Sequence, residues 1–142
     1  MTLDEAIAEF PAWAINQRAP NVDYTPWHLL EHLRITQWDM LTYIRDGDAY
    51  VEIEWPADYW PDKHAETDEA GFRQTVDQFR DDLREMQRLV SDEAFDLFAI
   101  VEGSPEHTPY RGIAIIGNHN SYHLGEFTVM RQVMGSWGPS HR

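Results

Sequence analysis

The stretch GIAIIGNHNSYHLGEF, residues 112–127, places two histidines four residues apart in an otherwise apolar helical pattern. A threonine-proline pair shortly before it and a glycine after it predict a helix from about Pro109 to Gly135. On a helical wheel, His119 and His123 lie at the centre of the buried stripe. An uncompensated buried imidazole costs about 1 to 3 kcal/mol, so these rings need hydrogen-bond partners or a common ligand.

Two further long helices are predicted from residue patterns. Thr25 and Pro26 are typical of a helix start and Gly47 of a helix end, which predicts a helix over residues 26–46. From 67 to 90, apolar residues follow the alternating four and three spacing of a helix seam. These apolar residues are Phe72, Val76, Phe79, Leu83, Met86 and Val90. The expected fold class is therefore all-α.

The connection between these two helices, residues 50–66, is rich in aromatic residues and is interrupted by two prolines. Proline interrupts regular elements, so we predict a loop that packs over one end of the helices. Its residues Trp55, Tyr59 and Trp60 are expected either to border the histidine site or to form a hydrophobic plug.

Length and composition predict one folded domain spanning residues 1–142, with 42% hydrophobic and 13% aromatic residues. The 25 Asp and Glu residues outnumber the 11 Lys and Arg residues, and the net charge of -14 argues against nucleic acid or a membrane as partner. The absence of cysteine excludes disulfides and sulfur-ligated metals. With no long apolar run and an acidic N-terminus, we expect a cytoplasmic protein.

The spacing of His119 and His123 lets both rings bind one ion, because residues four apart are neighbours on a helix. His32 is the best placed third ligand, since it flanks the core face of the 26–46 helix. Three nitrogen ligands would leave coordination positions open, as in catalytic sites. The alternative is that His32 bonds a backbone carbonyl or a core hydroxyl such as that of Tyr43.

The remaining histidines are not expected to be ligands. The helical wheel turns His28 toward solvent, as a surface residue or one behind a ligand, and His64, His107 and His141 lie in predicted loops or at the terminus. Glu126, three residues after the second histidine of the pair, could be a further ligand, an acceptor behind a ligand, a catalytic base or an ordinary solvated glutamate.

Four segments, WHLLEHLRITQWDML, WPADYWP, FRQTVDQFRDDL and NHNSYHLGEF, together resemble the DinB-like (DinB/YfiT) superfamily of proposed metalloenzymes, over most of the chain. The resemblance implies a four-helix bundle that binds a divalent metal, commonly zinc or nickel. His32, His119 and His123 match the three ligand positions of the family. Glu126 departs from the family pattern, which usually has glutamine there.

A second departure concerns the first helix of the bundle. A bundle helix needs roughly 20 residues to span about 30 Å, and the N-terminal stretch LDEAIAEFPAWAIN is interrupted by Pro11. We therefore expect a shortened or missing first helix. Without this helix, the bundle has an apolar groove where the helix would lie, and the uncovered apolar faces predict a homodimer. The segment around Ala6, Ile7 and Phe10 is expected to join the contact between the two chains or to fold back over the groove.

The resemblance implies a metal-dependent enzyme that acts on a small molecule. A thiol S-transferase, with a low-molecular-weight bacterial thiol as one candidate substrate, and a hydrolase are both compatible with an open metal site. Glu126 is the candidate catalytic residue. The alternatives are a non-catalytic metal-binding or stress-associated helical protein, and an acidic interaction module with incidental core histidines.

Overall fold

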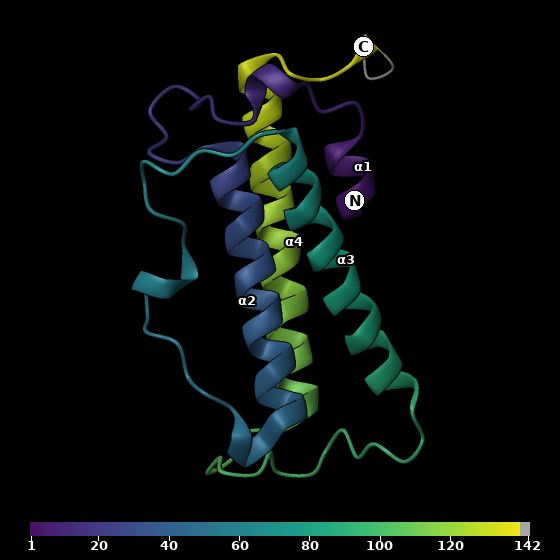
Figure 1. Cartoon of the computed structure of the whole chain (residues 1–142). Helices are drawn as coiled ribbons and strands as arrows, with labels where there is room; N and C mark the ends of the chain where they lie inside the picture. Colours follow the sequence, from purple (N-terminus) through teal and green to yellow (C-terminus); the bar gives the residue numbers. More distant parts are fainter. Residues whose placement is uncertain (140–142) are drawn as a thin grey trace.

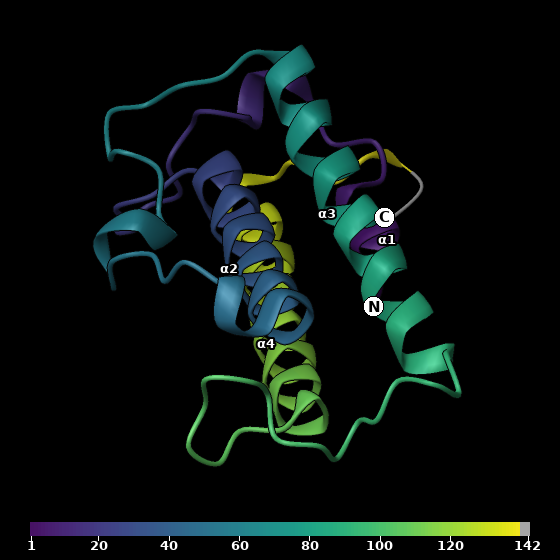
Figure 2. The ribbon, with the colours of Figure 1, turned by 60° about the horizontal axis from the view of Figure 1, so that its bottom comes forward.

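The computed structural model describes residues 1–139 and contains only helical elements and loops in this range. The α-helices are α1 (Leu3–Ile7), α2 (Pro26–Asp46), α3 (Glu69–Ser91) and α4 (Pro109–Met134). Short 3-10 turns are η1 (Ala12–Ala14), η2 (Gly47–Ala49) and η3 (Ala57–Tyr59). Helix α2 packs against both α3 and α4. Figures 1 and 2 show α2 and α4 side by side, with α3 diverging from them toward its C-terminal end. The predicted all-α bundle is confirmed.

The ends of the long helices are set by local capping. The Thr25 hydroxyl accepts the backbone N–H of His28 at 3.1 Å, and Thr108 accepts that of Arg111 at 3.2 Å. Proline occupies the first position of both helices, where its missing N–H costs nothing. Gly135 ends α4 in the left-handed conformation, with φ at 65°. The predicted bounds of α2 and α4 therefore agree with the structure to within a residue.

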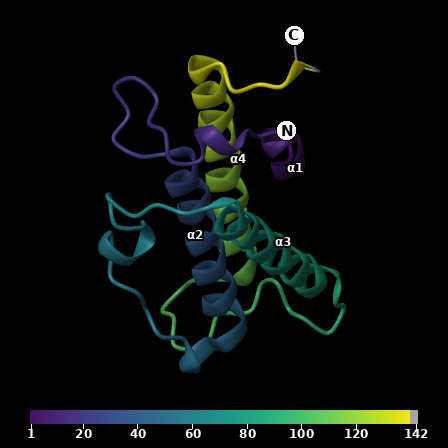
Figure 3. The same cartoon turned by 45° about the horizontal axis from the view of Figure 1, so that its top comes forward.

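The N-terminal segment folds back over the bundle. Leu3 and Ala6 are buried in the main core, and the ring of Phe10 stacks on that of Phe72 in α3 at 5.3 Å. Figure 3 shows α1 next to the C-terminal half of α4. The first helix of the structure, α1, has five residues. Of the two expected roles for this segment, the structure has it covering the groove.

A buried arginine fastens this segment to the end of the chain. Arg131 of α4 is fully buried and donates to the carbonyls of Ala6 at 2.6 Å, Ala8 at 2.9 Å and Ser136 at 2.8 Å. These bonds compensate part of the cost of burying a guanidinium. The N- and C-terminal segments thus share one buried hydrogen-bond network.

The outer face of α4 keeps several apolar side chains exposed. They are Ile115, Tyr122, Val129 and Val133. The homodimer stays a prediction, and sedimentation at micromolar concentration measures it directly. Within residues 1–139, no helix combines the length and the apolar character that crossing a membrane requires.

The aromatic connection runs along the side of α2, with η3 beside the middle of that helix, so the prediction that it packs over one end of the helices is wrong (Figure 1). Asp39, buried within α2, is the reason. Its two carboxylate oxygens accept the hydroxyls of Tyr50 at 2.7 Å and Tyr59 at 2.6 Å. A buried carboxylate needs such donors, and here they draw the connection along the side of α2.

Candidate metal centre

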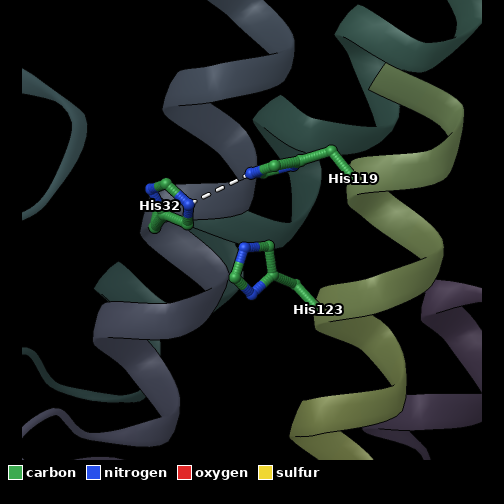
Figure 4. Close-up of side chains that lie close together, drawn as sticks. All are labelled: His32, His119 and His123. Atoms are coloured by element: carbon green, nitrogen blue, oxygen red, sulfur yellow. Dashed lines mark hydrogen bonds between the residues drawn. The ribbon is translucent and has the colours of Figure 1, made fainter. Parts of the chain in front are cut away.

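His32, His119 and His123 converge in the space between α2 and α4 (Figure 4). One potential ligand atom from each ring lies within 4.8 Å of the other two. The Nε2 atoms of His32 and His119 are 3.1 Å apart. The ring centroids of His119 and His123 are 4.5 Å apart, as expected for neighbours one turn apart on α4. The structure therefore brings together the three histidines that the sequence analysis selected.

The outer nitrogen of His32 has a fixed partner. Its Nδ1 lies 2.7 Å from the carbonyl oxygen of Tyr59. A carbonyl can only accept, so Nδ1 carries the proton and Nε2 presents its lone pair to the cluster. The alternative that His32 bonds a backbone carbonyl is therefore correct. Such a bond is also typical of metal-binding histidines, so it is compatible with a metal on Nε2. Tyr43 contacts His107 instead, at 3.0 Å.

An aromatic side chain covers one face of His32. The ring of Trp60 stacks on the imidazole with centroids 3.9 Å apart and an angle of 5° between the planes. The expectation that the aromatic connection borders the histidine site is thus confirmed for Trp60 and for the Tyr59 carbonyl. Trp55 is 71% exposed and does not form a buried plug.

The outer nitrogen of His123 also has a partner. Its Nδ1 lies 2.6 Å from Oε2 of Glu126, which favours a proton on Nδ1 and leaves Nε2 available. The other oxygen of Glu126 accepts a hydrogen bond from the hydroxyl of Tyr24. Among the alternatives for Glu126, this geometry matches the acceptor behind a ligand. Its catalytic role stays a prediction.

Tyr24 is a site residue that the sequence analysis missed. It lies in the loop before α2, and 102 residues separate it from Glu126. Burial, together with the Glu126 carboxylate, raises the pKa of its hydroxyl, which therefore stays protonated and donates. No local pattern marks this tyrosine, because its role depends on a contact between distant segments.

His119 differs from the other two rings because its outer nitrogen has no partner. Its Nδ1 is buried and forms no hydrogen bond within the described residues. Because the proton of His32 is on Nδ1, the 3.1 Å contact between the two Nε2 atoms requires a proton on Nε2 of His119. Because Nδ1 of His119 has no hydrogen-bond partner, the proton can move from Nε2 to Nδ1. Nε2 of His119 can then also bind a metal. The three rings fit a nitrogen-ligated ion.

The electrostatics of the cluster keep two of its rings neutral. Burial lowers the pKa of His119 to about 4, with further lowering by the neighbouring His123 and His32. Burial is also the main cause that lowers the pKa of His32, against a smaller raising effect of the Tyr59 carbonyl. Neutral imidazole is the form that binds metals. At neutral pH neither of these two rings is an imidazolium cation that must lose a proton before a metal can bind.

The other histidines lie outside the cluster. His28 is only 2% exposed, so the prediction that it points toward solvent is wrong. Its Nε2 donates to the carbonyl of Ala65 at 2.8 Å, and this distant segment is what buries it. His64 and His107 are exposed in loops, as expected. His141 lies outside the described residues.

The sequence as a whole identifies the family. The model of the DinB superfamily matches residues 1–127. The chain belongs to the DinB superfamily. No curated protein and no solved structure is significantly similar to it. All three clustered histidines fall inside the segment that matches the DinB superfamily.

Proposed function

We propose that the chain binds one divalent metal ion, zinc or nickel, through His32, His119 and His123 and acts as a metal-dependent enzyme on a small molecule. The convergence of three imidazole nitrogens from two helices, two of the rings with a fixed partner on Nδ1, carries this proposal. Zinc is commonly held by three protein ligands at catalytic sites, where further positions stay open. Nickel accepts the same imidazole donors.

The residues around the cluster have defined tasks in this proposal. The Tyr59 carbonyl and the Glu126 carboxylate each hold a proton on Nδ1 of a ligand histidine, which fixes the ring orientation. Tyr24 in turn holds the Glu126 carboxylate. Trp60 shields one face of His32 from water. Because both oxygens of Glu126 already accept hydrogen bonds, its contacts support positioning of His123 more directly than proton transfer with a substrate.

The proposed reactions are thiol S-transfer to an electrophile or hydrolysis. When bound, a divalent ion supplies Lewis acidity, which favours the deprotonated form of a thiol or a water at neutral pH. The family resemblance supports the thiol reaction as one of the two, with a low-molecular-weight thiol as candidate substrate. An assay of the metal-loaded protein with a thiol and an electrophile, beside an assay with an activated ester, separates transferase from hydrolase.

A metal-binding protein without turnover is the second candidate. The stacking of Trp60 on His32 favours it, because a covered ring leaves less room for a substrate at the ion. Elemental analysis of untagged protein is the first test, since a histidine tag would contribute its own ligands. One equivalent of zinc or nickel per chain supports the site, and its absence from protein purified with either metal contradicts both candidates. Turnover by the loaded protein then decides between them.

A further inference from the structure

A cleft of about 440 Å³ lies at the N-terminal end of α2, apart from the histidine cluster. Its walls come from residues 16–18, the start of α2 and residues 63–66. His28 lines this cleft, and His32 is one helical turn further along α2. The cleft and the candidate metal centre are therefore neighbours.

The charges that line the cleft are unusual for this chain. Six arginines form ion pairs with carboxylates in the described residues: Arg34, Arg45, Arg73, Arg80, Arg84 and Arg88. Arg18 and Lys63, the single lysine of the chain, line the cleft and belong to no ion pair within residues 1–139. Glu66 also lines it, as does His64. Two unpaired cations thus face one carboxylate in a protein of net charge -14.

Hydrogen bonds hold the walls of the cleft in place. The side chain of Asn16 donates to the carbonyl of Thr67 at 2.8 Å and accepts its N–H at 3.1 Å. His28 donates to Ala65, and Nη2 of Arg18 donates to the carbonyl of Lys63 at 2.6 Å. The last bond fixes the guanidinium at the cleft, where its remaining N–H groups can meet a ligand. The cleft is held at both walls before any ligand arrives.

We infer that this cleft is a binding site for the carboxylate or phosphate group of a small organic anion. Guanidinium and ammonium groups bind such oxyanions through charge-assisted hydrogen bonds, and Arg18 and Lys63 supply one group of each kind. The excess of negative charge elsewhere on the chain directs a small anion to the few places where cations are unpaired. This site does not depend on bound metal.

Calorimetric titration of metal-free protein with inorganic phosphate, and separately with succinate, tests the inference. We expect saturable binding of at least one probe, weakened about tenfold in Arg18→Gln and in Lys63→Gln. Arg111→Gln is the matched control. This residue is exposed at the start of α4, far from the cleft, has no ion pair within the described residues, and changes the net charge equally. Its affinity should stay within about twofold of the wild type.

Each outcome of the titration decides something. Binding of phosphate alone assigns a phosphate ester as ligand, and binding of succinate alone assigns a carboxylate. The His119→Ala, His123→Ala variant should bind the probe as the wild type does, which separates this site from the proposed metal centre. The inference is overturned by absence of saturable binding of both probes, or by an equal loss in Arg111→Gln.

Discussion

The first and second turns of α2 each carry a buried histidine, and the two rings have opposite tasks. His28 is 2% exposed and His32 is 3% exposed, so burial does not distinguish them. Both nitrogens of His28 are used within the protein, because Nδ1 accepts the N–H of Thr25 and Nε2 donates to Ala65. His32 bonds the protein backbone through Nδ1 alone and presents Nε2 to α4. A histidine that can serve as a ligand is thus recognised by the nitrogen that the fold leaves unprotonated and by what that nitrogen faces.

The largest effect should come from removing the α4 half of the cluster. We expect the His119→Ala, His123→Ala variant to lose nearly all bound metal, because one histidine cannot hold the ion. His28→Ala should keep one equivalent per chain, since neither of its nitrogens faces the cluster. Elemental analysis of untagged proteins measures both. Full metal content in the double variant would contradict the claim that His32, unlike His28, belongs to a metal-binding cluster.

Replacing His28 in the first turn of α2 should instead lower the stability of the fold. His28→Ala removes the side-chain half of the reciprocal cap with Thr25 and leaves the carbonyl of Ala65 without its donor. We expect the free energy of unfolding to fall by about 1 to 3 kcal/mol. Urea denaturation measures this change. The control is His64→Ala, because His64 is exposed in the loop that contains Ala65. A change below that of His64→Ala would show that the bond to Ala65 contributes no net stability.

A smaller effect should follow from loosening the partner of His32. Tyr59→Phe frees residue 59 from Asp39 and weakens the hold of its carbonyl on Nδ1 of His32. We expect metal affinity to fall up to about tenfold, as for other groups behind a ligand. Tyr50→Phe removes a bond to the same carboxylate without touching His32, so its affinity should change less than about threefold. Equal losses in the two variants would assign the effect to Asp39 as a whole.

The last effect concerns pH and the metal-free protein. The pKa of His119 is lowered to about 4 by burial, while an unfolded histidine titrates near 6.5. Below about pH 6.5 the unfolded chain therefore takes up protons that the folded ring does not. Stability should fall as the pH drops from about 6.5 to about 4, and this contribution should level off below that. The fall should be shallower in the His119→Ala, His123→Ala variant, as measured by urea midpoints across this window. Parallel curves would contradict the lowered pKa.

The sequence predicted those parts of the structure whose signals are local. The caps at Thr25 and Thr108 and the prolines after them fixed the starts of α2 and α4, and helical spacing placed the pair on α4 inward. The placement of His28 was wrong because a helical wheel contains no information about residue 65, 37 positions away. The position of the aromatic connection was missed for the same reason, since it follows from the partners of Asp39.

The hydrogen bonds of Arg131 have a consequence for how the protein is made. The carbonyl of Ala6 is synthesised before its hydrogen-bond donor, Arg131, which lies 125 residues later in the chain. At the usual rates of about 5 to 20 residues per second, the ribosome needs roughly 6 to 25 s to deliver it. Until α4 leaves the exit tunnel, the N-terminal segment lacks both this guanidinium and the apolar surface of the last helix. The N-terminal segment is therefore among the last parts of this domain to reach its native place, although it is made before the helices on which it packs.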